Sequence, residues 1–177
     1  MYPYRRLIKE ILTQRRAPRL ALGEVHRARL IVWPWDIDMF LELNNGRTLT
    51  LYDLGRFGMF LRSGYLGVAR EHGWAGTVAG TSIRYRHRIR AFERIELRSR
   101  MIAWDDRFTY CEQGFWKGDT CCSHGLLRLA VTDKDGIVPP SVVAERLGYP
   151  PISPPPPEWI KAWIEAEAQR PWPPNMA

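Results

Sequence analysis

The segment that follows Asn44 constrains the fold more than any other part of the chain, because it is apolar on nearly every side. It reads GRTLTLYDLGRFGMFLR from Gly46 to Arg62. Its large apolar residues fall on most faces of a helix, namely Leu49, Leu51, Tyr52, Leu54, Phe57, Met59, Phe60 and Leu61. A helix that is apolar nearly all round is a buried helix. Gly55 and Gly58 each cost a helix about 1 kcal/mol relative to alanine, so we expect a neighbouring backbone to approach closely there.

Strands flank this helix in the sequence. Residues 25–33 are rich in β-forming side chains and precede it, and a short helix is expected over 66–72. Four further strands are expected, joined by tight turns, within residues 78–90, 95–103, 108–116 and 121–132. Consecutive strands joined in this way form an antiparallel meander. The sequence therefore predicts an α+β protein in which a curved antiparallel sheet wraps around one long buried helix.

Two local patterns complete this assignment. Alternate residues of the strand over 95–103 are predicted to share one face, namely Ile95, Leu97, Ser99, Met101 and Ala103. A last short helix is expected over 141–147, with Ser141 as its N-cap.

Proline marks the end of the compact domain. Eleven of the 14 prolines lie at or after Pro139, and a segment so rich in proline behaves as a semi-rigid spacer. We therefore divide the chain into a basic N-terminal segment (1–21), a compact domain (22–148) and a proline-rich tail (149–177). The tail includes an amphipathic helix over 158–170, expected to dock on the domain or on a second subunit.

Composition excludes several classes of protein. With 26 Lys and Arg against 19 Asp and Glu, the net charge is +7, which permits a polyanionic partner without selecting one. No apolar run approaches the roughly 18 residues of a membrane span. The N-terminus has no signal-peptide core, so we expect a cytoplasmic protein. The three cysteines have no Cys-x-x-Cys spacing and the histidines are scattered, so we expect no metal.

The stretch over residues 33–47, WPWDIDMFLELNNGR, has the composition of a reactive loop. Asp36 and Asp38 follow the first strand, Glu42 lies further along, and Asn44 and Asn45 open the buried helix. The free N–H groups of a helix N-terminus carry partial positive charge. A carboxylate beside such a terminus suits acyl transfer, because one group activates the attack and the other holds the oxyanion. The competing interpretation is that these residues only cap the helix and shape turns.

Asp53 lies in the middle of the apolar helix, where an unpaired charge is costly. One interpretation is an i,i+3 ion pair with Arg56. The other is a polar group that reaches the reaction site.

These residues resemble those of the hotdog-fold acyl-CoA thioesterases, the relatives of hydroxybenzoyl-CoA thioesterase. The resemblance covers residues 24–148 and rests on Trp-Asp-x-Asp before Asn-Asn-Gly-Arg, with the later triplet Ala103-Trp104-Asp105. It implies that two protomers pair their sheets edge to edge, with active sites at the interface. It also implies that Asp38 is the catalytic carboxylate, and that the backbone N–H of Asn45 polarises the thioester carbonyl.

The chain departs from the family pattern in the loop. Where many members have Gly-His-Val-Asn-Asn, this chain has Leu41-Glu42-Leu43-Asn44-Asn45. Glu42 either replaces the imidazole as a general base or marks a loss of turnover. Other branches carry the catalytic acid on the helix, where Asp53 is the candidate. The order of preference for the carboxylate is therefore Asp38 first, then Glu42 and Asp53.

A basic segment is the second candidate binding element. In RYRHRIR (84–90), strand alternation would place Arg84, Arg86, Arg88 and Arg90 on one face. Of these, Arg84, Arg86 and Arg88, together with Asn44, are expected to bind the substrate. Guanidinium groups suit the phosphates of coenzyme A, although a solvated sheet face is the simpler interpretation. Tyr85 falls on the opposite face, and this argues against nucleic acid, which needs aromatic side chains among the cations.

Three functions compete. The first is a homodimeric or homotetrameric thioesterase that hydrolyses a fatty or aromatic acyl-CoA and needs no cofactor beyond the coenzyme A of its substrate. The second is a non-catalytic acyl-thioester or lipid-binding protein on the same fold. The third is a basic interaction protein that grips RNA or an anionic membrane. The first requires Asp38 to face the helix tip across an open cleft. If its side chain were turned into bulk solvent, or bonded only within its own loop with no opening beside it, the enzymatic account that rests on Asp38 would fail.

Overall fold

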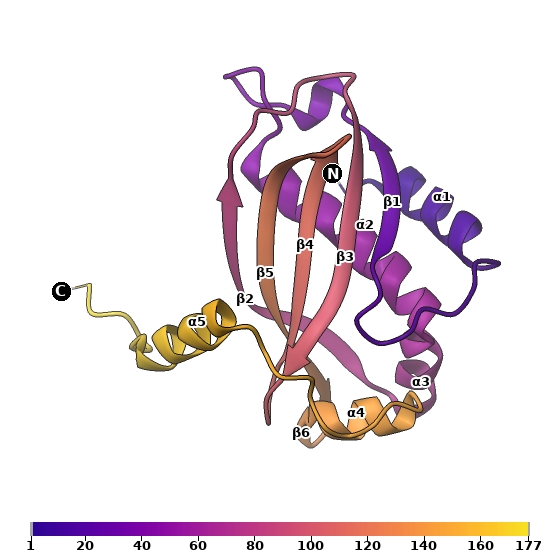
Figure 1. Cartoon of the computed structure of the whole chain (residues 1–177), viewed down its shortest axis with the longest axis vertical. Coiled ribbons are helices and arrows are strands. Elements are labelled where there is room, and N and C mark those ends of the chain that lie inside the picture. Colours follow the sequence, from indigo (N-terminus) through magenta and orange to yellow (C-terminus); the bar gives the residue numbers. More distant parts are fainter. Residues whose placement is uncertain (1, 177) are drawn as a thin grey trace.

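The computed structural model describes residues 2–176 and contains one curved antiparallel sheet with helices around it (Figure 1). The α-helices are α1 (Tyr4–Gln14), α2 (Asn45–Ser63), α3 (Tyr65–His72), α4 (Pro140–Arg146) and α5 (Glu158–Gln169), with a 3-10 turn η1 (Pro34–Asp36). The strands are β1 (His26–Ile31), β2 (Ala75–Tyr85), β3 (Arg94–Trp104), β4 (Thr109–Lys117), β5 (Thr120–Asp133) and β6 (Gly136–Val138).

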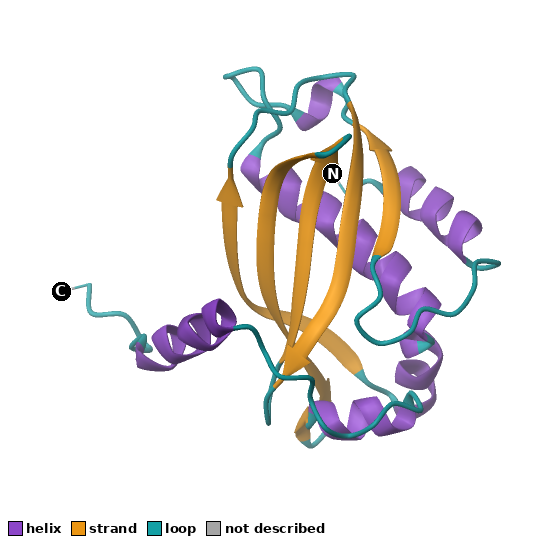
Figure 2. Ribbon diagram, in the orientation of Figure 1, coloured by secondary structure: helices purple, strands orange, loops and turns teal. Residues whose placement is uncertain are grey.

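The strands pair in the order β1-β3-β4-β5-β2, every pair is antiparallel, and β6 adds to β5. Helix α2 runs across the concave face of this sheet (Figure 2). Strand β2 ends the order, and its outer edge has no partner among the described residues. The structure confirms the predicted α+β arrangement of a sheet wrapped around one long helix.

The core lies between α2 and the concave face of the sheet. Leu51, Tyr52 and Leu54 of α2 are fully buried, as are Leu97 and Phe115 of the strands that face them. The Tyr52 ring packs against that of Phe115 with 4.9 Å between centroids. Burial of such side chains supplies about 1.5–3 kcal/mol each, so tertiary packing stabilises a helix that Gly55 and Gly58 weaken in its interior.

The glycines of α2 mark close approaches, but by side chains rather than by the expected backbone. A Cβ added at Gly55 would lie 2.5 Å from Leu97 Cδ2 of β3. One added at Gly58 would lie 2.5 Å from His26 Nε2. His26 is bonded at 2.9 Å to Glu10 of α1, and both side chains are buried. The basic N-terminal segment is therefore packed into the fold through α1.

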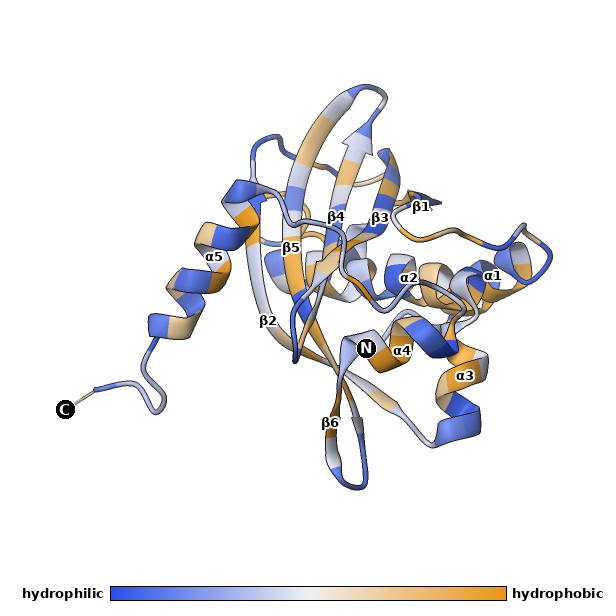
Figure 3. Ribbon diagram, turned by 60° about the horizontal axis from the view of Figure 1, so that its bottom comes forward, coloured by the Kyte–Doolittle hydropathy of each residue, from blue (hydrophilic) through white to orange (hydrophobic). Residues whose placement is uncertain are grey.

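Helices α3 and α4 cover the end of the sheet that lies at the bottom of Figure 1. Figure 3 shows hydrophobic residues on both helices where they approach each other, and Tyr65, Ala69, Val138 and Val143 form a buried cluster there. Helix α4 begins at Pro140 with Pro139 as its N-cap, so the expectation of a Ser141 cap is wrong. Proline is accepted in a first helical turn because its missing N–H would have no partner there.

The tail helix α5 docks on the convex face of the chain's own sheet. Ile160 is fully buried against Tyr110 and Leu126, and the Trp163 ring meets that of Tyr110 edge-on at 6.3 Å. The predicted helix is confirmed, and of the two docking sites expected for it the structure has the one on its own domain. Beyond this contact α5 projects away from the body (Figure 1).

Candidate active site

Asp36 anchors the reactive loop. Its carboxylate is 1% exposed and accepts the N–H of Trp33 at 2.9 Å. It also lies 2.5 Å from a guanidinium nitrogen of Arg6 in α1 and 3.2 Å from Nε of Arg47 in α2. Because both neighbours are cationic and the group is buried, this carboxylate has a structural role that fixes the loop between the two helices.

Asp38 closes its own loop. Its Oδ1 accepts the N–H of Phe40 at 2.8 Å and that of Glu42 at 3.5 Å. Its own N–H donates to the carbonyl of Glu42 at 2.9 Å. The side chain lines none of the three cavities described for the chain. The expectation that Asp38 faces the helix tip across a cleft is therefore not met in the single chain, because nearby backbone donors already hold the carboxylate.

The N-terminus of α2 is the electropositive end predicted from the sequence. Asn44 is the N-cap, and its Oδ1 accepts the N–H of Arg47 at 3.1 Å. No acceptor within the described part of the chain takes the N–H groups of Asn45 and Gly46. These two donors and the positive end of the helix dipole are available to a bound oxyanion.

A cavity of about 160 Å³, which we call the tip cavity, lies beside this terminus. Glu42 lines it, with a side chain that is 33% exposed, and Glu42 Oε2 lies 3.1 Å from Nε of Arg88 across it. The complete lining is Glu42, Leu43, Asn45, Thr48, Tyr85, Arg86, His87, Arg88, Ile89 and Ser123. The structure thus brings together four predicted site residues, Glu42, Asn45, Arg86 and Arg88.

The arginines are not presented by a strand as predicted. Strand β2 ends at Tyr85, and residues 86–90 form a loop. The pairing ends because the N–H groups of Arg86 and His87 both donate to the single carbonyl of Cys122, at 2.9 and 3.1 Å. Arg84 remains on β2 and does not line the tip cavity. The loop, rather than strand alternation, therefore places Arg86 and Arg88 at the cavity.

Sequence reasoning missed Tyr85 and Thr48 as lining residues. Burial raises the pKa of the Tyr85 hydroxyl, and its hydrogen bond to the Thr48 side chain opposes that rise. Tyr85 lies two residues after Ile83 on β2, so the two side chains are on the same face of the strand. This spacing was the one signal in the sequence that the Tyr85 ring faces the helix.

A second, larger cavity of about 300 Å³, which we call the apolar cavity, lies along the middle and end of α2. Asp53 and Arg56 lie in its wall and form the predicted i,i+3 ion pair. Arg56 is buried and donates to Gln113 Oε1 at 2.7 Å. Burial raises the pKa of Asp53, against the smaller opposing effect of Arg56. Most of the remaining wall is apolar and includes Phe57, Phe60, Val78, Met101, Leu129, Val131, Val143 and Leu147.

The two cavities are separated along the helix. Asp53 follows Asn45 by eight residues, a rise of about 12 Å at 1.5 Å per residue. In a single chain Asp53 therefore does not join Glu42 and Asn45. Within residues 2–176 no group of three His, Cys, Asp or Glu side chains is placed to hold a metal ion, and no helix there is long and apolar enough to cross a membrane.

The sheet wrapped around α2, with a polar cavity at the helix tip, defines the class of hotdog-fold thioesterase-like proteins. Residues 32–164 match the sequence model of the thioesterase-like superfamily. The chain belongs to this superfamily.

Curated relatives carry the name Protein THEM6. The chain is 41% identical to the Xenopus laevis protein over 85 residues, which is 48% of this chain and 41% of that protein. It is 30% identical to the Drosophila melanogaster protein over 134 residues, 74% of this chain and 67% of that protein. The match thus spans less than half the length of the Xenopus relative.

Solved structures share the fold at low identity. YbaW, a probable thioesterase from Escherichia coli, superposes with a TM-score of 0.65 and 16% identity, over 69% of this chain and 96% of that one. A DHNA-CoA thioesterase from Staphylococcus aureus gives 0.59 and 12%, over 81% of this chain and 91% of that one. At such identities the likeness concerns the fold alone.

Proposed function

We propose that the chain is an acyl-CoA thioesterase that hydrolyses a fatty or aromatic acyl-CoA in the tip cavity. The observation that carries this proposal is that a half-buried carboxylate, Glu42, and the first residue of α2, Asn45, line one cavity. Glu42 takes a proton from a water molecule that attacks the thioester carbonyl. The N–H of Asn45 holds the oxyanion that develops, and its collapse expels the coenzyme A thiolate.

In this proposal Glu42 is the catalytic carboxylate, a role that the family resemblance gave to Asp38. The carboxylate of Asp38 is engaged by the N–H groups of Phe40 and Glu42, so in this proposal it is a positioning residue that holds Glu42 in the loop. This arrangement also accounts for the glutamate where many relatives have histidine, because the carboxylate itself acts as the base.

The open edge of β2 supports a homodimer that completes the site. Antiparallel pairing of two β2 edges would place Tyr85 of one protomer beside the beginning of the other protomer's β2. Tyr85 borders the tip cavity, while Gly76, Thr77 and Val78 border the apolar cavity. The tip cavity of one protomer would then meet the apolar cavity of its partner, which would receive the acyl chain and supply Asp53. A tetramer would bury further surface without adding a group to this site.

Coenzyme A is held by the loop arginines in this proposal. Arg86 and Arg88 line the tip cavity and are exposed at its rim, where guanidinium forks can pair with the pyrophosphate and the 3′-phosphate. All three cysteines are unpaired, which suits the reducing cytoplasm where we place the activity.

The test is thiol release from short, long and aromatic acyl-CoA substrates by the wild type and by Glu42→Gln, Asp38→Asn and Asp53→Asn. Loss of a general base lowers kcat by about 10²–10⁴-fold, and we expect that loss for Glu42→Gln. Asp38→Asn, which keeps an acceptor for the loop, should retain more activity than Glu42→Gln. Equal rates for Glu42→Gln and the wild type across the panel would overturn the proposal.

A non-catalytic acyl-thioester-binding protein is the second candidate. The ion pair of Glu42 with Arg88 favours it, because the guanidinium occupies the carboxylate oxygen that would otherwise accept a proton from water. Calorimetry that shows acyl-CoA binding, together with no thiol release by the wild type, would select this function.

A further inference from the structure

Six large apolar side chains stand exposed at one end of the molecule. We call them the apolar loop patch, and they are Trp33 (36% exposed), Trp35 (69%), Met39 (86%), Phe40 (70%), Leu41 (69%) and Phe92 (65%). They come from the reactive loop and from the loop between β2 and β3. Exposed apolar residues on this scale in one place are unusual on a monomer and mark an interaction surface.

The two loops hold these side chains in place together. The N–H of Leu43 donates to Ile89 O at 2.8 Å, and the N–H of Phe92 donates to Val32 O at 2.6 Å. The Trp33 ring stacks on that of Trp35, with 5.4 Å between centroids, and meets the Phe92 ring edge-on at 6.3 Å. These contacts join Trp33, Trp35 and Phe92 into one aromatic cluster. Met39, Phe40 and Leu41 belong to the same reactive loop, which backbone hydrogen bonds join to the second loop.

Two members of the patch adopt a strained backbone. Leu41 has φ 60° and Phe92 has φ 66°, a left-handed conformation that bulky side chains rarely adopt. This conformation brings the Cβ of each residue too close to the following carbonyl oxygen. In this conformation the side chains of Leu41 and Phe92 are exposed to solvent.

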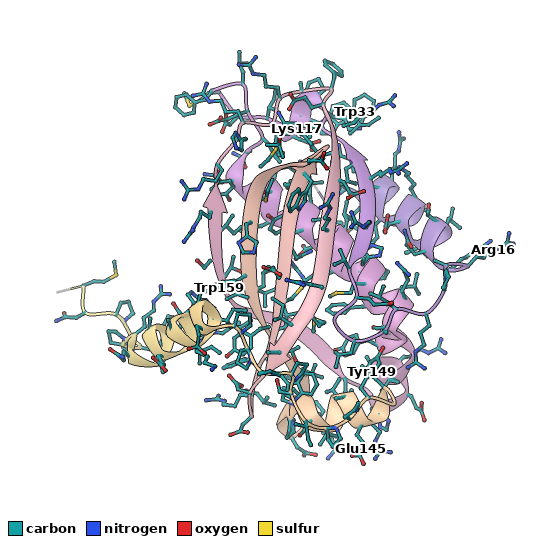
Figure 4. All side chains as sticks on the ribbon, in the orientation of Figure 1. Arg16, Trp33, Lys117, Glu145, Tyr149 and Trp159 are labelled. Atoms are coloured by element: carbon teal, nitrogen blue, oxygen red, sulfur yellow. The ribbon has the colours of Figure 1, made fainter. Side chains whose placement is uncertain are left out.

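Exposed cations lie beside the patch. Arg86, Arg88 and Arg90 are all exposed on the second loop, and Figure 4 shows Trp33 and Lys117 at the same end of the sheet, opposite Glu145 and Tyr149.

Four acids of this end are held within the protein. Asp36 pairs with Arg6, Asp38 caps its own loop, and Glu93 pairs with Lys117 at 3.1 Å. Glu42 pairs with Arg88. Asp119, in the turn after Lys117, is the exposed acid of this end. A surface that approaches this end therefore meets more exposed cations than exposed acids, together with the apolar side chains.

We propose that the apolar loop patch docks the protein on an anionic phospholipid membrane. Tryptophan and phenylalanine side chains enter the headgroup region, while arginines beside them pair with acidic lipids. Protruding apolar side chains with cations beside them suit a deformable lipid surface. In the proposed dimer a second copy of the chain binds elsewhere, at the open edge of β2. The tip cavity lies between the same two loops, so docking places its mouth at the membrane, where amphiphilic thioesters partition.

This proposal does not depend on turnover, and it is tested by flotation of the full chain with vesicles. The vesicles are phosphatidylcholine alone, or phosphatidylcholine with phosphatidylserine. The test variant is Phe40→Ser/Leu41→Asn/Phe92→Asn, because asparagine tolerates the left-handed conformation and relieves the strain. Arg90→Gln tests the charge. The matched control is Ile152→Ser, since Ile152 is 78% exposed but lies on the segment before α5.

We expect the wild type and the control to float with the phosphatidylserine vesicles. The triple variant should bind these vesicles at least about tenfold more weakly than the wild type, since membrane affinity scales with buried apolar area. Arg90→Gln should weaken binding, and high salt should weaken it further. Thermal unfolding checks that the variants are folded.

Three results would overturn the proposal. They are flotation of the triple variant equal to the wild type, equal binding to neutral vesicles, and dissociation of an oligomer by the triple variant in sedimentation. The last would show that the patch joins copies of the chain.

Discussion

Glu42 and Arg88 form an ion pair, with 3.1 Å between Oε2 and Nε, that joins the two loops lining the tip cavity. The pair gives the candidate base a fixed position beside the start of α2. In the proposed function this guanidinium would also meet the phosphates of coenzyme A, so the same arginine would orient the base and bind the substrate.

Replacing Arg88 tests this double role. We expect Arg88→Gln to raise KM for acyl-CoA by about tenfold, the loss of one charged hydrogen bond. For an acyl-pantetheine thioester, which lacks the phosphates bound by the arginines, KM should change little. Arg70→Gln on α3, at the other end of the molecule, is the control and should leave both values unchanged. An equal rise for both thioesters would show that Arg88 does not contact the phosphates.

Gly58 should not tolerate a side chain. The added Cβ of Gly58→Ala would meet His26 Nε2 at 2.5 Å and Glu10 Oε1 at 2.6 Å. Overpacking costs about 1–3 kcal/mol, more than the gain of about 1 kcal/mol in helix propensity. Urea unfolding should therefore show a net loss.

Gly67→Ala is the matched control for Gly58→Ala. Gly67 lies within α3, and a Cβ there meets nothing within 4 Å. It should stabilise the chain by about 0.5–1 kcal/mol. A stabilised Gly58→Ala protein would contradict the packing described for α1, β1 and α2.

Much of this architecture was predictable from the sequence because burial imposes simple patterns. The apolar circumference of α2 predicted a buried helix, and Asn44 predicted its start. The i,i+3 spacing predicted the ion pair of Asp53 with Arg56. Each of these features depends on residues close together in the chain.

Features set by distant partners were not predictable. β2 ends at Tyr85 because β5 supplies only the carbonyl of Cys122 to the residues that follow. A bulge between Met101 and Ala103 pairs Ala103 with Tyr110, on the face covered by α5 rather than the predicted inner face. The family resemblance gave Asp38 the catalytic role, but sequence motifs do not report which backbone donors hold the carboxylate.

Stability should depend on pH through Asp53. Burial raises the pKa of its carboxyl in the folded chain, so the folded state holds more protons between the unfolded and the folded pKa. Stability contributed by this group therefore falls as pH rises through that window. The unfolding free energy of Asp53→Asn minus that of the wild type should increase with pH across it. A constant difference would show that Asp53 titrates normally.

The tail helix should contribute to the stability of the domain. Ile160 is fully buried against the convex face of the sheet. Truncation of a buried isoleucine costs about 2–5 kcal/mol, and Ile160→Ala should lie toward the lower part of that range because its cluster is small. Thermal unfolding measures the loss, with Ile152→Ala as an exposed control. An unchanged Tm would mean that α5 does not stay docked in solution.

The most direct test of the account is a crystal structure of Glu42→Gln trapped with an uncleaved acyl-CoA. The account predicts the thioester carbonyl oxygen within hydrogen-bond distance of the Asn45 N–H, with the substituted side chain at position 42 beside the carbonyl carbon. It also predicts the phosphates near Arg86 and Arg88, and the acyl chain in the apolar cavity of the partner protomer. A thioester bound away from the start of α2, or facing Asp38 instead of residue 42, would contradict it.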